Sequence, residues 1–376
     1  MKKIVLAIDS FKGCLSSAEA ERAAEAGIKA VFPACEVVRV SVADGGEGML
    51  DAWLPVLHAT VVPVQAHDAL MQPVCARYGI SGDGRTAVIE MAAVNGLAGV
   101  PPEKRNPWEA TTYGTGELIR DALTKGCRNF LVGIGGSATN DAGLGMLRAL
   151  GFRLLDKNGN ELGVGGRILG QVVAVDGAHA DPLLKEARFT VACDVHNPFC
   201  GPEGAARIFA AQKGASEEQI KRLDAGMYSL ASVIRQSTGK EVTDYPGAGA
   251  AGGLGGALWA FLGAELNPGI GLLLDAVGFS ERIAGADWVI TGEGRADRQT
   301  PMGKVAAGVV AAAKKQHIPV MLIAGSIADV PELNRLGAKG VFSVVPGPVS
   351  LAEAMQPAYA AANITRLMQQ LCMLWA

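Results

Sequence analysis

A glycine-rich run between Gly133 and Gly145 contains the residue types that bind phosphate. It reads GIGGSATNDAGLG and begins within an apolar segment, Phe130–Ile134. Glycines let backbone N–H groups approach an anion closely, and a helix that begins after such a turn adds partial positive charge at its N-terminus. The run therefore predicts a phosphate-binding turn that serves a nucleotide.

The polar side chains of this turn bear on which ligand it binds. The spacing Gly133-x-Gly135-x-x-Ala138 also satisfies the loose dinucleotide fingerprint, with Asp156 downstream. The helix after that fingerprint normally becomes apolar at once, whereas four polar residues crowd this turn, which favours phosphate together with a metal. A tight structural turn is the remaining alternative. The four polar residues are Ser137, Thr139, Asn140 and Asp141.

Three more loops combine glycine with charged residues, and each follows an apolar segment. They are DSFKG at 9–13, ADGGEG at 43–48 and GEGRADRQT at 292–300. In a doubly wound sheet, ligands bind beyond the carboxyl ends of the strands. One such loop could be an ordinary polar turn, but three on one rim predict a cleft with several carboxylates and several cations.

Two further segments would add to this cleft. CDVHNP at 193–198 follows an apolar stretch and would deliver Asp194, while QKGA at 212–215 offers Lys213 to a phosphate. The alternative for Lys213 is an ordinary surface lysine.

The inventory of reactive side chains favours phosphoryl transfer over hydrolysis. Five histidines are dispersed, no serine lies in a nucleophile elbow, and the Walker A and protein-kinase signatures are absent from the sequence. Aspartates, lysines and glycine turns dominate instead. Phosphoryl transfer uses such groups, because cations and metal neutralise the phosphates and an aspartate orients or deprotonates the acceptor hydroxyl.

The elements that must position these residues alternate between apolar strands and helices. This alternation predicts a parallel sheet covered by helices on both faces. A capping box, Ser16 with Glu19, starts the first helix. The expected strands are 4–8, 37–42, 130–134, 189–193, 288–291, 320–324 and 340–345, and later helices are 48–57, 305–315 and 351–371.

The chain of 376 residues is long enough for two domains. Segments 1–57 and 280–376 together predict one discontinuous α/β domain, a Rossmann- or flavodoxin-like doubly wound fold. Segment 58–279 predicts a second, inserted α/β domain. Between about 58 and 90, short alternating strands separated by Gly/Asp turns favour hairpins.

Composition excludes several classes of partner. The net charge is only −3 with both signs interspersed, so we expect neither nucleic-acid nor membrane-surface binding. The uncharged stretch 245–264 is rich in glycine and only weakly apolar, which predicts a buried helix at about 254–263. Seven scattered cysteines and the lack of a signal-peptide pattern predict a reducing, cytoplasmic location.

The motifs together resemble bacterial glycerate kinases of the glycerate kinase type-1 family. Ala142, Ala296 and Pro301 depart from the family pattern, but none of these changes removes a charged group. The motifs span nearly the whole chain: DSFKG at 9–13, ADGGEG at 43–48, ATTYGTGELI at 110–119, GIGGSATNDAGLG at 133–145, CDVHNP at 193–198, QKGA at 212–215, GAGAAGGLG at 247–255, and ITGEGRADRQT at 290–300 with Gly303-Lys304.

The resemblance implies ATP-dependent phosphorylation of D-glycerate with Mg²⁺ in a two-domain enzyme. It favours 2-phosphoglycerate as the product, with 3-phosphoglycerate as the alternative, and a role in glyoxylate, glucarate or galactarate catabolism. A homodimer is compatible with it. Two other classes stay open, an NAD-dependent 2-hydroxyacid oxidoreductase and a non-catalytic small-molecule binding protein.

The substrate suggests roles for the charged loops. Glycerate carries a carboxylate, for which Lys12 and Arg295 are the expected cations. Asp44 and Glu47 are expected to bind its hydroxyls or the magnesium ion. Closure of the two domains would exclude water from the reaction. The complete expected substrate set is Ser10, Lys12, Asp44, Gly45, Glu47 and Arg295.

The remaining roles concern ATP, the metal and the acceptor hydroxyl. Asp194 and Asp297 are rival candidates for metal ligand and for the base, and with Lys12 they form the expected catalytic set. The expected phosphate ligands are Gly135, Gly136, Ser137, Thr139, Asn140 and Lys213. The expected metal ligands are Asp141, Asp194 and Glu293.

Overall fold

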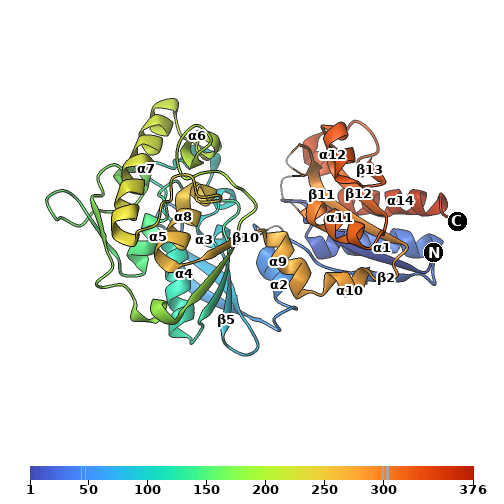
Figure 1. Ribbon diagram of the computed structural model, residues 1–376. Coiled ribbons are helices and arrows are strands. Elements are labelled where there is room, and N and C mark those ends of the chain that lie inside the picture. Colours follow the sequence, from blue (N-terminus) through green and yellow to red (C-terminus); the bar gives the residue numbers. More distant parts are fainter. Residues whose placement is uncertain (44, 47, 299, 302–304) are drawn as a thin grey trace. The chain divides into compact units, whose positions relative to one another are not determined.

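Both ends of the chain build one unit, and the middle of the chain builds another (Figure 1). The computed structural model describes residues 1–376 except 44, 47, 299 and 302–304. Unit 1 comprises Met1–Asp44 and Ile270–Ala376, and unit 2 comprises Gly45–Gly269.

These bounds differ from the expected ones at both junctions. Helix α2 (Met49–Trp53) belongs to unit 2, where a Cβ at Gly79 would lie 2.8 Å from the Leu50 side chain. Helix α9 (Gly269–Ala276) lies almost wholly in unit 1, where Ile270 packs closely against Gly308. The packing of these helices assigns segments 45–57 and 270–279 to units opposite to the expected ones.

Unit 1 contains a parallel sheet of five strands in the order β2-β1-β11-β12-β13. Renumbered along this unit, the order is 2-1-3-4-5, as in flavodoxin-like folds, and the topological switch point lies between β1 and β11. The doubly wound prediction is confirmed. The strands are β1 (Lys3–Ile8), β2 (Glu36–Arg39), β11 (Trp288–Ala296), β12 (Val320–Ile327) and β13 (Gly340–Ser343).

Helices cover both faces of this sheet (Figure 1). On one face, Ile4 and Leu6 of β1 are buried with Ile28 of α1 (Ser17–Val31) and Ile364 of α14 (Pro357–Met373). On the other, Leu322 of β12 is buried with residues of α11 (Val305–Lys315) and α12 (Val330–Leu336). The short helix α10 (Phe279–Ile283) precedes β11.

Local sequence signals explain where these helices begin and end. The predicted capping box of α1 is present, since Ser16 N–H donates to Glu19 Oε2 at 2.8 Å and Ser16 Oγ accepts from Glu19 N–H at 3.3 Å. The expected single helix over 351–371 is instead two, α13 (Leu351–Ala354) and α14. The break falls at Gln356, which is extended because a following proline disfavours the helical conformation.

Unit 2 contains a mixed sheet of six strands in the order β10-β9-β6-β5-β4-β3. The first four are parallel neighbours, and β5, β4 and β3 pair antiparallel, which confirms the predicted hairpins. A separate antiparallel ribbon joins β7 to β8. The strands are β3 (Thr60–His67), β4 (Pro73–Ile80), β5 (Thr86–Glu90), β6 (Asn129–Gly133), β7 (Arg153–Leu155), β8 (Ala174–Asp176), β9 (Arg188–Ala192) and β10 (Glu265–Asn267).

One apolar core joins this sheet to its helices, with Ile89, Phe130 and Val191 buried in it. The rings of Phe130 and Phe189 stack across neighbouring strands at 4.7 Å between centroids. The α-helices are α3 (Ala92–Asn95), α4 (Tyr113–Thr124), α5 (Leu144–Ala149), α6 (Ala205–Phe209), α7 (Glu217–Thr238) and α8 (Ala250–Leu262). Short 3₁₀ turns cover Leu97–Gly99, Pro102–Lys104, Gly166–Ile168, Pro182–Glu186 and Ala211–Lys213.

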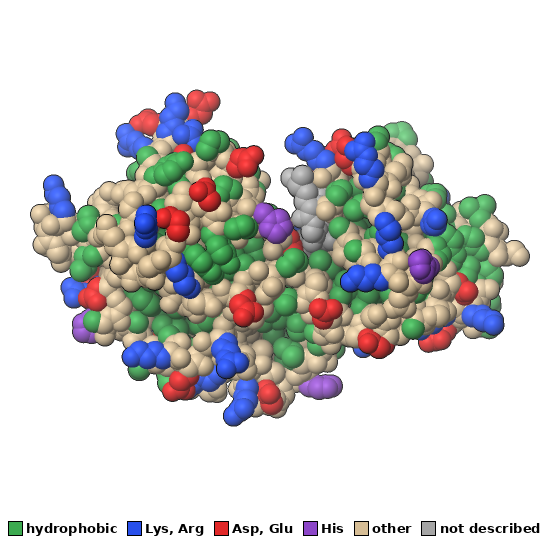
Figure 2. All heavy atoms as spheres, in the orientation of Figure 1, with side chains coloured by type: hydrophobic (Ala, Val, Ile, Leu, Met, Phe, Trp, Pro, Cys, Tyr) green, Lys and Arg blue, Asp and Glu red, His purple; other side chains and the backbone are tan. Residues whose placement is uncertain are grey.

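Stretch 245–264 forms a glycine-rich turn and then helix α8, whose backbone is non-helical from Ala251 to Gly253. Within the residues that the structure describes, no helix has the length and apolar character needed to cross a membrane. Figure 2 shows basic and acidic side chains interspersed on the face displayed.

Candidate active site

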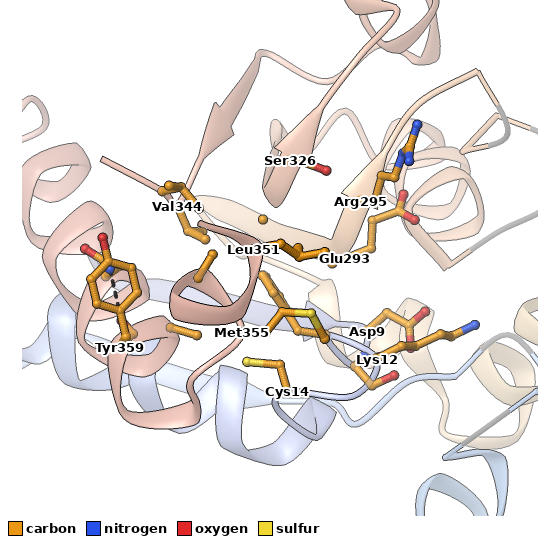
Figure 3. A pocket seen from close by; sticks show the side chains of 18 residues that line it. Asp9, Lys12, Cys14, Glu293, Arg295, Ser326, Val344, Leu351, Met355 and Tyr359 are labelled. Carbon is orange, nitrogen blue, oxygen red and sulfur yellow. Dashed lines mark hydrogen bonds between the residues drawn. The ribbon is translucent and has the colours of Figure 1, made fainter. Parts of the chain in front are cut away.

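A pocket of about 370 Å³ opens in unit 1 at the carboxyl ends of β1 and β11, where the fold predicts a ligand. One end is polar and the other apolar (Figure 3). The predicted residues Ser10, Lys12, Glu293 and Arg295 all line it. The polar end also includes Asp9 and Ser326, and the apolar end includes Phe11, Cys14, Val344, Val345, Leu351, Met355 and Tyr359.

Asp9 received no role in the prediction, although it follows the first strand directly. It is 5% exposed, and its Oδ1 accepts from Ser10 N–H at 2.7 Å. Its own N–H donates to Gly292 O at 2.9 Å, which ties the loop after β1 to β11. The signal that could have found it is its place at the carboxyl end of a strand beside the switch point.

The loop after β11 holds its charged residues through a short hydrogen-bond chain. Thr300 Oγ1 donates to Glu293 Oε1 at 2.7 Å and accepts from Asp297 N–H at 3.0 Å. Asp297 Oδ2 lies 3.1 Å from Arg295 Nε, and the Arg295 side chain is 72% exposed. Asp297 therefore forms an ion pair with Arg295, the cation expected to bind substrate. Asp297 itself does not line the pocket.

The glycine-rich run of unit 2 differs from the expected strand–turn–helix. Strand β6 ends at Gly133, but α5 begins only at Leu144 and is six residues long. Its N-terminus therefore does not follow the turn directly. All four polar side chains of the turn are buried, three of them with no exposed area.

Asp141 holds the turn to the start of α4. Its Oδ2 accepts from Thr112 N–H at 2.8 Å, from the hydroxyls of Thr111 and Thr112 at 3.0 Å each, and from Gly145 N–H at 3.2 Å. Its Oδ1 accepts from Gly143 N–H at 3.2 Å. Burial raises the pKa of Asp141, and these hydrogen bonds oppose that shift. Both carboxylate oxygens of Asp141 already accept hydrogen bonds from the chain itself, which argues against the expected metal-binding role.

Lys213 is an internal group and not a surface lysine. It is 3% exposed, and its Nζ donates to Ser137 Oγ and to Thr139 O, each at 2.7 Å. Burial lowers its pKa to about 7, and the negative charge of Asp141 acts in the opposite direction. The structure thus brings Lys213, Ser137 and Thr139 together as predicted, but in a buried cluster that fixes the turn.

Close packing accounts for the glycines of three motifs. Gly135 N–H donates to Gly45 O at 3.3 Å, and a Cβ at Gly135 would lie 2.8 Å from Gly46 Cα. A Cβ at Gly252 would lie 2.1 Å from Thr139 O. Glycine is needed at Gly135 and Gly252 because a side chain at either position would collide with the backbone of a neighbouring motif.

Two carboxylates lie at the carboxyl ends of the parallel strands of unit 2. Asp194 follows β9, is half-buried, and accepts from Gly269 N–H at 2.9 Å. Glu90 ends β5 and accepts from Leu50 N–H at 2.6 Å, a role that the sequence did not suggest. The predicted Asp44 and Glu47 lie outside the described residues. Among the residues that the structure describes, no three His, Cys, Asp or Glu side chains gather closely enough to hold a metal.

Comparison with known proteins decides the family. The model of the Glycerate kinase family matches residues 4–376. The chain belongs to the glycerate kinase family. The resemblance drawn from the motifs is confirmed, and the chain is a kinase.

Members of the glycerate kinase family match this chain over almost its full length. It is 49% identical to the glycerate 2-kinase of Escherichia coli strain K12 and 47% identical to the glycerate kinase of Bacillus subtilis strain 168, each over 95% of this chain and 94% of the relative. The crystal structure of a candidate glycerate kinase 2 from Salmonella typhimurium LT2 has a TM-score of 0.85 at 43% identity. The match covers 100% of this chain and 98% of the Salmonella chain.

Proposed function

We propose that this member of the glycerate kinase family transfers the γ-phosphoryl group of ATP to D-glycerate and gives 2-phospho-D-glycerate and ADP. The observation that carries the proposal is the unit 1 pocket, where Lys12 and Arg295 share the polar end with Asp9 and Glu293. The names of the relatives support glycerate as the acceptor. The name of the Escherichia coli relative, a glycerate 2-kinase, supports the 2-position over the 3-position.

Cations at the polar end suit the negative charges of both reactants. Glycerate brings a carboxylate, and we assign Lys12 and Arg295 to it. The acceptor hydroxyl must approach within about 3–3.5 Å of the γ-phosphorus, so cations near the carboxylate also act on the transferring group. Fixed positive charge at that point stabilises the transition state of phosphoryl transfer.

The carboxylates of the pocket fit a magnesium ion. Mg²⁺ is usually held by one or two carboxylates together with substrate phosphates and waters, so a cage of protein ligands is not required. Asp9 and Glu293 meet that need from adjacent strands, and Asp194 is the corresponding candidate in unit 2. When bound, the ion neutralises charge on the phosphates.

Two aspartates remain candidates for receiving the proton of the acceptor hydroxyl. Asp297 lies beside Arg295, with 3.1 Å between Asp297 Oδ2 and Arg295 Nε. Asp194 accepts a hydrogen bond from Gly269 N–H at 2.9 Å, just after β9. The buried side chains of Ser137 and Asp141 hold the shape of the glycine-rich turn. Because Gly135 N–H donates to Gly45 O, only the exposed Gly136 remains assigned to phosphate contacts.

An assay of ADP release tests the proposal. We expect ADP release in the presence of ATP, Mg²⁺ and D-glycerate, and a ³¹P spectrum of the product that shows the ester at carbon 2. An ester at carbon 3 would support the same kinase with the other product. Absence of turnover with D-glycerate would refute the proposed substrate, and substrate-dependent nicotinamide absorbance would support the oxidoreductase alternative.

A further inference from the structure

The unit 1 pocket is too large and too apolar to serve glycerate alone. Its volume of about 370 Å³ falls within the range of roughly 300–1,000 Å³ that is usual for sites of small organic ligands. Glycerate is a three-carbon acid that is polar on every carbon, and it would use only the charged end. The apolar end therefore needs another occupant.

The lining of that end favours a flat, weakly polar ring. Cys14 comes from the loop after β1, Val344 follows β13, Leu351 comes from α13, Met355 follows α13, and Tyr359 comes from α14. Figure 3 shows Tyr359 and Val344 away from the cluster of Asp9, Lys12, Glu293 and Arg295, with Leu351, Met355 and Cys14 between the two ends. Aromatic rings and methionine sulfur both make favourable contacts with planar ring systems.

Two of these apolar side chains are unusually exposed. Leu351 is 74% exposed and Met355 is 37% exposed, although both border the pocket. Large apolar groups gathered at a concave site are typical of ligand-binding surfaces, because a bound apolar group removes them from water. An occupant that covers Leu351 and Met355 would therefore be stabilised by their burial.

We propose that the apolar end of this pocket binds the purine base of ATP, with the triphosphate directed toward Lys12 and Arg295. This inference rests on the proposed kinase function. ATP has the same polarity gradient as the pocket, an apolar ring at one end and concentrated negative charge at the other. The pocket also lies at the switch point of a flavodoxin-like sheet, where nucleotides bind in this class of fold.

A bulky residue inside the pocket tests the proposal, and a neighbouring position provides the control. Ala354 lines the pocket, whereas Ala352 lies on the same short helix, is exposed and does not line it. We expect Ala354→Phe to weaken ADP binding, measured by calorimetry, by about tenfold or more, and Ala352→Phe to leave it within about twofold. Equal ADP affinity in Ala354→Phe and the wild type, or no ADP binding to the wild type, would overturn the proposal.

Thiol labelling of the wild-type chain gives a second measurement that does not depend on a folded variant. Cys14 lines the pocket and Cys75 is exposed in unit 2, so both can be followed after treatment with methyl methanethiosulfonate by mass spectrometry. We expect adenosine and ADP to slow labelling of Cys14 but not of Cys75, and D-glycerate to have little effect on either.

The outcomes separate this inference from the proposed function. ADP binding that leaves Cys14 labelling unchanged would place the base elsewhere, even if glycerate is phosphorylated. Conversely, protection of Cys14 by adenosine in a chain that does not phosphorylate D-glycerate would support the base site and refute the substrate. Protection by D-glycerate alone would assign the pocket to the acceptor and overturn the inference.

Discussion

The Nζ of Lys213 lies 2.7 Å from Ser137 Oγ, inside unit 2, and joins two motifs that are 76 residues apart. A lysine in this position fixes the glycine-rich turn through its hydrogen bonds. Its burial also makes the stability of the fold depend on pH.

The first prediction concerns that dependence. Burial lowers the pKa of Lys213 from 10.5 to about 7, so between these values the unfolded chain binds more protons than the folded one. Stability should therefore rise with pH across this interval, by at most about 1.4 kcal/mol per pH unit for one group. Lys213→Met should remove this contribution, which urea unfolding of wild type and variant at several pH values would measure.

Lys221→Met is the control for this experiment, because Lys221 is exposed on helix α7. Its profile should run parallel to that of the wild type. If the difference in free energy of unfolding between wild type and Lys213→Met does not change from about pH 7 to 10, Lys213 does not titrate in this way.

A second prediction concerns Glu21, which is 1% exposed on α1. Burial raises its pKa from 4.5 to about 8, so the folded chain binds the extra proton between these values. Stability should therefore fall as pH rises through this interval. Glu21→Gln keeps the shape without the charge, and it should be more stable than wild type above about pH 8 by a few kcal/mol in thermal or urea unfolding.

Glu25→Gln on the same helix is the comparison, because Glu25 makes only a partly exposed ion pair with Arg39 at 3.4 Å. It should change the pH profile little. Equal pH profiles for Glu21→Gln and the wild type would contradict a protonated Glu21.

A third prediction tests the cation at the polar end of the pocket. Lys12→Ala should raise the KM for D-glycerate by about tenfold or more at saturating ATP, because a charge-assisted contact to the carboxylate is lost. Lys339→Ala, which removes a lysine just before β13 and away from the pocket lining, should leave the KM unchanged. An unaltered KM in Lys12→Ala would remove Lys12 from the substrate site.

The fourth prediction separates the two candidate bases. Asp194→Asn or Asp297→Asn should lower kcat by about 10²–10⁴-fold, as expected when a general base is lost. Asparagine keeps an oxygen that can accept from Gly269 N–H, so the Asp194 variant should retain its fold. Steady-state kinetics with parallel thermal unfolding would show which aspartate acts. Wild-type turnover in both variants would refute both assignments.

The sequence predicted the features that depend on local pattern. Apolar stretches such as Ile4–Ile8 form parallel strands, and the capping box at Ser16 starts a helix. The charged loops after β1 and β11 meet in one pocket, since the carboxyl ends of neighbouring parallel strands share one edge of the sheet.

The features that escaped prediction depend on tertiary contacts. Glycines at 133–145 read as an anion site, but spacing alone cannot show that Gly252 packs against Thr139 O. Likewise, the sequence predicted one helix over 351–371, and only the fold brings Leu351 and Tyr359 to the pocket. The proline at 357 carried the signal for the break between the two helices.

The discontinuity of unit 1 has a consequence for how the chain folds as it is synthesised. Ile4 pairs with Trp288 in the same sheet, so β1 must wait for residues that are made only after unit 2. Unit 2, from 45 to 269, is complete before β11 emerges. During that delay β1 and β2 present an open, apolar strand edge, the kind of surface that invites pairing with other chains. The nascent chain is therefore most vulnerable to aggregation after unit 2 has folded and before Trp288–Ala296 is available.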